Sequence, residues 1–339
     1  MPSSQTLTPA TVPSRGRFDA TVEMNRPLCR EHYLLRFRVA GTFSPTRPGQ
    51  FIQIGCRPPD AAIDTHTLLG REIEWSNGQW PALDQPEACA PMALLRRPFS
   101  IAGRGDDEHG TWLEIIHRVV GVGTQWLGQL EPGDAIDLIG PLGNAFTLPP
   151  GKSLGLLVGG GVGLPPMFYL AEAMRRANWD AVGFVGAMTR DLLAVSFVED
   201  VQPPADGAPL LCVDEFARHR HPAVITTNDG SLGLMGFITD GLLRYLGSMS
   251  AADKRRAVIY TCGPHGMMHA VAQLAEQHGI DCQVCLEQAM ACGMGTCQSC
   301  VVKIEDTQRP QDCTPAGRPW RFRLACTDGP VFDSRSVLW

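Results

Sequence analysis

Three cysteines near the C-terminal end have the spacing that points most clearly to chemistry. Four residues separate Cys292 from Cys297, two more separate Cys297 from Cys300, and Gly293 and Gly295 lie in the first gap. Thiolates at these offsets, on backbone that glycine allows to wrap tightly, are typical of the plant-type loop that holds a 2Fe–2S cluster. Structural zinc is the competing interpretation, but zinc sites usually use paired C-x2-C units. The spacing therefore favours an iron–sulfur cluster.

Such a cluster needs a fourth thiolate, and two cysteines are candidates. Cys313 follows Cys300 after 12 residues in a polar segment, and Cys326 follows it after 25 residues, just before an Asp-Gly-Pro-Val-Phe run. Composition alone does not choose between them. The cysteine that is not a ligand is expected to be an ordinary exposed thiol.

A glycine-rich turn stands in the middle of the chain, within Leu157-Val-Gly-Gly-Gly-Val-Gly-Leu-Pro-Pro166. Backbone amides at Gly160, Gly161 and Gly163, where an apolar strand runs into a helix, are suited to binding phosphate oxygens. Leu164 stands where a strict G-x-G-x-x-G motif has its last glycine. A strand-to-helix turn without a ligand is therefore the alternative interpretation.

Several short groups in the first half carry side chains and amides that suit a flavin nucleotide. An arginine can pair with phosphate, and a serine hydroxyl can bond to a flavin ring edge. A later Gly-Thr pair can supply an amide and a hydroxyl to a pyrophosphate. Without context, such residues are more often surface residues. The candidates are Arg97, Pro98, Phe99, Ser100, Ile116, His117, Arg118, Gly123 and Thr124.

Cys262 and Gly263 form another candidate site, at the predicted end of an apolar strand. Ligands of open parallel sheets bind beyond the carboxyl ends of the strands, which would place this pair beside a bound nucleotide. A buried, inert thiol is the equally weighted alternative.

The segments that position these residues show two different patterns of predicted secondary structure. The first half alternates short β-rich runs with glycine and proline, which is typical of an antiparallel barrel or sandwich. We assign it to residues 18–149, with a surface insertion at 56–95 and a disordered tail at 1–17. The predicted strands are Phe18–Val22, Leu34–Val39, Phe51–Ile54, Leu113–Val120 and Ala135–Ile139.

From residue 150 to 285, short apolar runs alternate with helical segments, which predicts a parallel sheet covered on both faces and a nucleotide-binding α/β domain. Residues 286–339 form a small C-terminal module around the cysteines. The predicted strands are Leu154–Val158, Val182–Val185, Leu210–Val213, Val224–Thr226 and Val258–Thr261, and the predicted helices are Pro166–Arg176, Phe237–Leu246 and Met267–His278.

Composition excludes several classes of partner. The 339 residues carry 29 Lys and Arg against 35 Asp and Glu, a net charge of −6, so no nucleic acid or anionic membrane partner is expected. Glycines and prolines interrupt the longest apolar stretch, Ser153 to Ala171, so no bilayer span is expected either. The start of the chain does not resemble a secretory signal, which predicts a cytoplasmic protein with reduced thiols.

Taken together and in this order, the motifs resemble the ferredoxin–NADP reductase superfamily. They resemble more closely the electron-transfer subunits of NAD-linked, two-subunit dihydroorotate dehydrogenases. The resemblance runs from about Phe18 to Phe332 and is most specific in the cysteine region. It rests on Arg97–Ser100, Arg118–Thr124, Gly140–Gly143, Gly159–Gly163, Thr227–Gly233, Cys262–Pro264, Met290–Gly293 and Cys326–Phe332.

The resemblance implies FAD at Arg97–Ser100, Ile116–Arg118 and Gly123–Thr124, and a 2Fe–2S cluster on Cys292, Cys297, Cys300 and Cys326. It implies a heterotetramer with a separate FMN subunit, which oxidises dihydroorotate in pyrimidine biosynthesis. Electrons would pass from it through the cluster to FAD and then to NAD⁺. No catalytic residue for dihydroorotate is then expected in this chain. The sequence departs from the family pattern in two places. The gap from Cys300 to Cys326 is longer than usual, so Cys313 remains a candidate for the fourth ligand. The insertion at 56–95 is also unusual.

Two other functions fit parts of the sequence. One is an NAD(P)H-dependent reductase that feeds an oxygenase, a ferredoxin, a sulfite reductase or a hydrogenase. The other is a non-catalytic subunit that binds zinc and a regulatory nucleotide. The choice between NAD and NADP depends on residues near 186–190, where Arg190 could meet a 2′-phosphate. The resemblance favours NAD.

Overall fold

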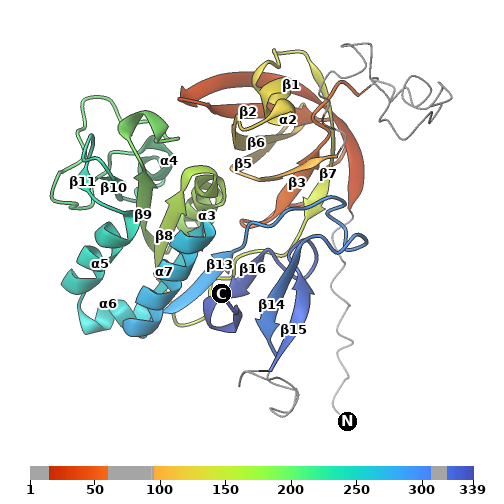
Figure 1. Cartoon of the computed structure of the whole chain (residues 1–339). Helices are drawn as coiled ribbons and strands as arrows, with labels where there is room; N and C mark the ends of the chain where they lie inside the picture. The colour runs from red at the N-terminus through yellow and green to blue at the C-terminus, as the bar shows by residue number, and fades with distance from the viewer. Residues whose placement is uncertain (1–14, 60–92, 94, 307–318) are drawn as a thin grey trace, which may run out of the picture.

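The computed structural model describes residues 15–59, 93, 95–306 and 319–339. Within these ranges the chain forms two lobes, a curved β lobe and an α/β lobe, with a β ribbon beside them (Figure 1). No helix in the described ranges is long and apolar enough to cross a membrane.

The predicted antiparallel architecture of the first half is confirmed. The β lobe is a curved seven-stranded sheet in the order β4-β3-β7-β1-β2-β6-β5. Apolar side chains such as Leu35, Phe37, Ile52 and Ile115 alternate along the strands and fill its concave core. The short helix α2 follows β6. The elements are β1 (Gly16–Cys29), β2 (His32–Val39), β3 (Phe51–Ile54), β4 (Arg97–Ser100), β5 (Gly103–Asp107), β6 (Gly110–Arg118), α2 (Val122–Gly128) and β7 (Ala135–Leu142).

Strand β1 begins at Gly16, so it includes the last two residues of the predicted tail. Arg17 forms an ion pair with Asp137 of β7, the strand next to β1, which gives this end of the strand a partner. Residues 1–14 of that tail, and residues 60–92 and 94 of the predicted insertion, lie outside the described residues.

The α/β lobe contains the predicted parallel sheet, whose strands follow the order β11-β10-β9-β8-β12-β13. Helices α5 and α7 pack on one face, whereas α3 and α4 pack on the other. The elements are β8 (Leu154–Gly160), η2 (Gly161–Gly163), α3 (Leu164–Arg176), β9 (Asp180–Ala187), η3 (Arg190–Leu192), α4 (Asp214–Ala217), β10 (Ala223–Thr227), β11 (Leu234–Met235), α5 (Ile238–Ser248), α6 (Ala251–Arg256), β12 (Ala257–Cys262), α7 (His265–Gln277) and β13 (Asp281–Cys285).

One predicted parallel strand, Leu210–Val213, is wrong. Leu210 and Leu211 are exposed, and Leu210 and Val213 form only isolated antiparallel bridges. The position beside β9 belongs to Ala223–Thr227, and Val213 leads directly into α4. A four-residue apolar run does not distinguish a sheet strand from a half-buried connection.

The C-terminal segment is tied to the α/β sheet rather than standing apart from it. Its strands are β14 (Val301–Glu305), β15 (Trp320–Leu324) and β16 (Val331–Asp333), followed by η5 (Ser334–Ser336). The first two form a separate antiparallel ribbon, while β16 pairs with β13 and extends the parallel sheet by one antiparallel strand. The cysteine loop is therefore held between the sheet and the β lobe.

Candidate cofactor sites

The cysteine loop that precedes β14 brings its first two thiols together. The backbone amides of Met294 and Cys297 both donate to Cys292 Sγ, at 3.5 and 3.4 Å. Gly293 and Gly295 have φ values of +69° and +90°, which a residue with a side chain rarely adopts. These two glycines, predicted to let the backbone wrap tightly, are therefore required by the backbone itself.

Cys300 and Cys326 form a second pair. Cys300 closes the loop, Cys326 follows β15, and both are buried. The amide of Ala325 donates to the Cys300 carbonyl oxygen at 2.9 Å, and the two thiols are hydrogen bonded to each other. The rival fourth ligand, Cys313, lies outside the described residues.

Cys297 and Cys326 have opposite electrostatic environments. The Ser299 hydroxyl and amide lower the pKa of Cys297 to about 6, because they stabilise its thiolate. Burial and the hydrogen bond to Cys300 raise the pKa of Cys326 to about 12. In the described part of the chain, no three His, Cys, Asp or Glu side chains converge closely enough to hold one metal ion. The arrangement is two cysteine pairs, as two irons with two thiolates each require.

Strand β3 of the β lobe lies directly against this loop. The side chain of Gln53 is so close to Gly293 that a Cβ added there would lie 2.6 Å from Gln53 Cδ. Gln53 is fully buried, and neither of its amide atoms has a hydrogen-bond partner among the described residues. No sequence motif marks Gln53, because a glutamine in a short strand has no characteristic spacing.

Asn144 provides a second connection that the sequence did not reveal. Its side-chain amide donates to the carbonyl oxygens of Asp328 and Val331 at 3.0 and 2.8 Å, and its Oδ1 accepts from the Val331 amide at 2.9 Å. Asn144 follows β7, so it ties the segment after Cys326 to the β lobe. The only nearby feature that the sequence marked was the run Gly140–Gly143, directly before Asn144, which carries part of the family resemblance.

The predicted flavin residues Arg97–Ser100 form β4, which pairs with β3. Gln53 is opposite Pro98 in this pairing, so the strand predicted to bind flavin is the neighbour of the strand that touches the cysteine loop. The Arg97 guanidinium donates only to the carbonyl oxygens of Leu95 and Arg96 among the described residues. It is therefore available to an anion.

His117 occupies a dry position at the end of β6. Its ring is stacked on Tyr33, with centroids 5.6 Å apart, and meets the edge of Phe99. It is 1% exposed, and neither ring nitrogen has a partner among the described residues. Burial, helped by neighbouring His32, lowers the pKa of His117 to about 4, so its ring is neutral at pH 7. The two ring nitrogens therefore have a hydrogen-bonding capacity that the described residues do not use.

The remaining predicted flavin residues are already engaged within the chain. Arg118 pairs with Glu31 at 2.8 Å. The Thr124 hydroxyl donates to the Gly121 carbonyl oxygen and accepts from the Val120 and Gly121 amides. Gly123 is buried where a Cβ would lie 3.0 Å from Ala93 and Cys56. Thr124 therefore shapes the turn before α2 with its hydroxyl.

The glycine turn and the Cys262 segment meet at the carboxyl edge of the parallel sheet. Strand β8 pairs with β12, and a Cβ at Gly163 would lie 2.1 Å from the Cys262 carbonyl oxygen. Gly161 has a φ of +56° and faces open space. Hydrogen bonding to Cys285 and burial hold the pKa of Cys262 well above its usual range, so Cys262 is a neutral thiol. Gly160, Gly161, Gly163, Cys262 and Gly263 are thus brought together.

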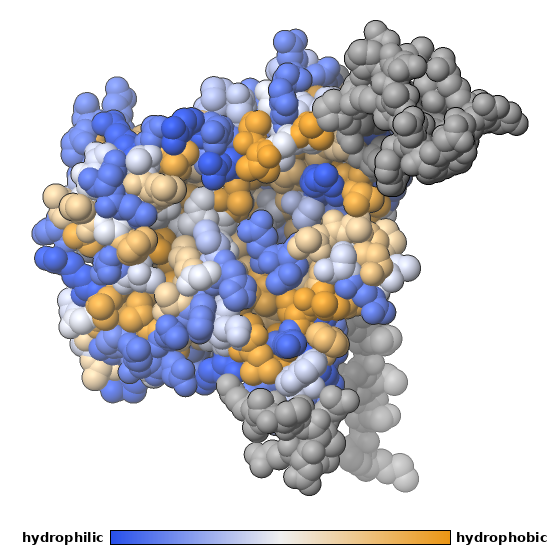
Figure 2. Space-filling model, viewed as in Figure 1, coloured by the Kyte–Doolittle hydropathy of each residue, from blue (hydrophilic) through white to orange (hydrophobic). Residues whose placement is uncertain are grey.

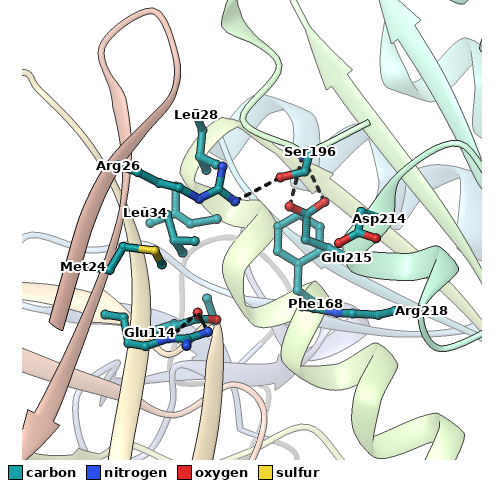
Figure 3. A pocket seen from close by; sticks show the side chains of 13 residues that line it. Met24, Arg26, Leu28, Leu34, Glu114, Phe168, Ser196, Asp214, Glu215 and Arg218 are labelled. Carbon is teal, nitrogen blue, oxygen red and sulfur yellow. Dashed lines mark hydrogen bonds and ion pairs between the residues drawn. The ribbon is translucent and has the colours of Figure 1, made fainter. Parts of the chain in front are cut away.

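A cleft of about 280 Å³ lies elsewhere, between the β1–β2 hairpin and the helices α3 and α4 (Figure 3). Two of its carboxylates have partners within the chain, since Arg36 pairs with Glu114 and Glu215 accepts from the Ser196 amide. Arg26 bridges the lobes by donating to Ser196 Oγ at 3.2 Å. Among the predicted cofactor residues only Ile116 lines this cleft, so the cofactor surfaces are separate from it.

Exposed apolar side chains occur in the cysteine loop and on the ribbon that follows it. Met294, Val301 and Phe322 are 48%, 38% and 59% exposed. Figure 2 shows apolar residues gathered on this side of the molecule, around the ribbon of β14 and β15. Such a surface is typical of a contact with another protein.

Comparison with known proteins agrees with this geometry. Residues 287–338 match the family model described as the iron–sulfur cluster binding domain of dihydroorotate dehydrogenase B. A chain from the NADH-dependent reduced ferredoxin-NADP oxidoreductase has a similar fold, with a TM-score of 0.66 and 24% identity over 94% of this chain and 90% of that one. The Amycolatopsis cytochrome P450 reductase GcoB has a TM-score of 0.53 and 20% identity over 79% and 67%.

Curated relatives cover most of the chain. The NAD⁺-linked dihydroorotate dehydrogenase B electron-transfer subunit of Desulforamulus reducens is 33% identical over 73% of this chain and 81% of its own. That of Geobacillus kaustophilus is 33% identical over 80% and 91%. The subunit of Caldanaerobacter subterraneus is 28% identical over 96% and 100%. By these matches, the chain belongs to the family of electron-transfer subunits of NAD⁺-linked dihydroorotate dehydrogenase B.

Proposed function

We propose that this chain carries electrons from an FMN-containing dihydroorotate dehydrogenase subunit, through a 2Fe–2S cluster and FAD, to NAD⁺ in pyrimidine biosynthesis. The observation that carries the proposal is the packing of the cysteine loop on β3, the strand paired with the predicted flavin strand β4. This packing supports two redox groups held side by side by a rigid sheet.

The described cysteines fit the cluster. Cys292 and Cys297 would hold one iron, and Cys300 and Cys326 the other, since the chain arranges them as two pairs. The amides of Met294 and Cys297 already point at Cys292 Sγ, and amide hydrogen bonds to sulfur stabilise an anionic cluster. The chain thus supplies ligands and hydrogen bonds before iron arrives.

The β lobe fits FAD. Arg97 would pair with phosphate, Ser100 and the strand β4 amides would meet the ring, and Ile116–Arg118 and Gly123–Thr124 would support the rest. The unpaired nitrogens of His117 are the structural observation that supports this assignment. When bound, FAD exchanges electrons singly with the cluster and in pairs with nicotinamide. Arg118 donates to Glu31 through Nε and Nη2, so Nη1 is the guanidinium nitrogen that would meet the ligand.

The carboxyl edge of the parallel sheet fits NAD. Gly161 presents its amide at an open position, so a nucleotide phosphate can approach the backbone closely. Cys262 and Gly263 would flank the nicotinamide, with the neutral Cys262 thiol acting as a spacer rather than a nucleophile.

The exposed apolar residues around the loop support a protein partner there. Met294, Val301 and Phe322 would be covered by the FMN subunit, which would bring the electron donor close to the cysteine loop. We propose a heterotetramer of two relay and two FMN subunits. We also propose the cytoplasm as its location, where the free thiols of the described cysteines would stay reduced.

The deciding experiment uses tagged chain isolated gently with its natural partner. Dihydroorotate and NAD⁺ are mixed with it without oxygen, and NADH formation is followed at the same time as the iron and flavin content is measured. We expect NADH to appear only when the FMN subunit is present. A chain that holds iron and FAD and is reduced by NADH, yet makes no NADH from dihydroorotate with that subunit, would serve a different acceptor.

A further inference from the structure

Gln53 is a buried polar side chain that the proposed electron path does not use so far. It lies on β3 between Ile52 and Ile54, whose side chains fill the core of the β lobe. Because side chains alternate along a strand, Gln53 points the other way, toward the cysteine loop. It is 0% exposed, and neither Oε1 nor Nε2 has a partner in the part of the chain that the structure describes.

The Gln53 amide lies flat against Gly293. A Cβ built on Gly293 would lie 2.6 Å from Cδ, 2.7 Å from Oε1 and 2.9 Å from Nε2 of Gln53, so only glycine is compatible with this contact. Gly293 directly follows Cys292 in the chain. The amide therefore lies against the residue that directly follows the first cysteine of the loop.

An unpaired amide in a dry interior is costly, and such groups almost always have a partner. The sulfur side of an assembled cluster is an anionic acceptor next to Cys292. It would already receive the Met294 and Cys297 amides from within the loop. Gln53 is positioned to add a donor from outside the loop, on the strand adjacent to β4.

We propose that Gln53 Nε2 donates a hydrogen bond to the sulfur atoms of the cluster at Cys292 and thereby raises the reduction potential of the cluster. Reduction adds negative charge to the sulfurs, so a hydrogen-bond donor stabilises the reduced cluster more than the oxidised one. Gln53 is thus a positioning and tuning residue that favours arrival of an electron. This inference rests on the cluster of the proposed function.

The test compares two buried glutamines of the same segment in the full chain. Gln53→Leu removes the unpartnered amide. Gln50→Leu removes an amide that is already satisfied, because Gln50 Oε1 accepts from the Arg47 amide and Nε2 donates to the Gly143 carbonyl oxygen. Both glutamines are buried, so both changes replace a buried amide by a similar apolar volume.

For both variants we would measure iron and sulfide per chain and the EPR spectrum of the reduced protein. Redox titrations followed by EPR and by absorbance would give the potentials of the cluster and the flavin. We expect Gln53→Leu to keep its iron. The equilibrium constant for one-electron transfer from cluster to FAD should rise by up to about tenfold, because the cluster potential falls by up to about 59 mV. Its flavin potential should be unchanged. Gln50→Leu should lower the melting temperature and leave the cluster potential as it was.

An iron-loaded Gln53→Leu protein with the wild-type potential overturns the inference, as does an equal shift in both variants. Should Gln53→Leu not fold, Gln53→Met takes its place, and Gln53→Asn, which keeps a retracted amide, should have a potential between those of wild type and Met. Loss of iron from all Gln53 variants would make Gln53 an assembly residue and would also refute the inference. A wild-type chain without iron would refute the proposed function itself.

Discussion

At the scale of single residues, the first prediction concerns which cysteine is the fourth cluster ligand. Cys326 is buried and hydrogen bonded to Cys300, whereas Cys313 lies outside the described residues. We expect Cys326→Ser to lose most of its iron and its visible absorption. Cys313→Ser is the matched control and should retain both. Iron analysis and the absorption spectrum measure this, and the opposite pattern would assign Cys313 as the ligand.

A second residue-scale prediction concerns pH. His117 has a pKa of about 4 when folded, below the usual unfolded value of about 6.5. Between these values the unfolded chain binds a proton that the folded chain does not, so stability rises with pH in this window and is lost as the pH falls. From pH 7 to 5, His117 should contribute a loss of about 2 kcal/mol.

The variant His117→Phe keeps an aromatic ring against Tyr33 and Phe99 and removes the titration. Urea unfolding at pH 7 and pH 5, followed by tryptophan fluorescence, measures the difference. The variant should lose less stability than wild type on acidification. If both lose the same amount, another group dominates, for example His219, whose pKa burial also lowers to about 4.

At the scale of elements, the glycine turn between β8 and α3 has two glycines with different tasks. At Gly163 a Cβ would collide with the Cys262 carbonyl oxygen, while at Gly161 it would meet open space. We expect Gly161→Ala to cost about 1–2 kcal/mol for its positive φ alone. Gly163→Ala should cost more and weaken NADH binding, because β8 and β12 must separate.

Thermal unfolding and NADH titration of the two variants check this. Equal effects, or a greater effect at Gly161, would mean that the turn does not pack on β12 as described. The sequence identified the turn from glycine content, but it did not distinguish these two roles. The distinction depends on Cys262, which is about a hundred residues away in the chain.

At the scale of the whole molecule, Asn144 connects the β lobe to the C-terminal segment. Its side chain makes three hydrogen bonds with Asp328 and Val331. At about 1 kcal/mol each, Asn144→Ala should loosen this segment by about 3 kcal/mol. Electron transfer between cluster and FAD should slow, since the loop would no longer be held against β3.

Hydrogen exchange measured by mass spectrometry should show faster exchange in β15 and β16 of this variant, with β8 unchanged as the internal control. Stopped-flow reduction by NADH then reports how fast electrons reach the cluster. Unchanged exchange in β15 and β16 would show that the β13–β16 pairing alone holds the segment.

The sequence alone determined the order of the parts and the ligand types. Short β-rich runs separated by glycine and proline indicated the antiparallel sheet, and wholly apolar runs between helices indicated the parallel sheet. The spacing of Cys292, Cys297 and Cys300 indicated the cluster loop. All three are local properties of the chain. The prediction of a parallel strand at Leu210–Val213 was wrong because apolar character is a local property of the sequence. Whether a segment pairs within the sheet depends on the tertiary fold.

Only the tertiary structure decided which of these parts touch. The pairing of Cys326 with Cys300, the contact of Gln53 with Gly293 and the Asn144 bridge join residues distant in sequence. No local pattern encodes them, since each depends on how β3, β16 and the loop pack. These contacts depend on the tertiary structure because electron transfer requires two redox sites held close together on one rigid framework. The folded chain builds that framework from segments far apart in the sequence.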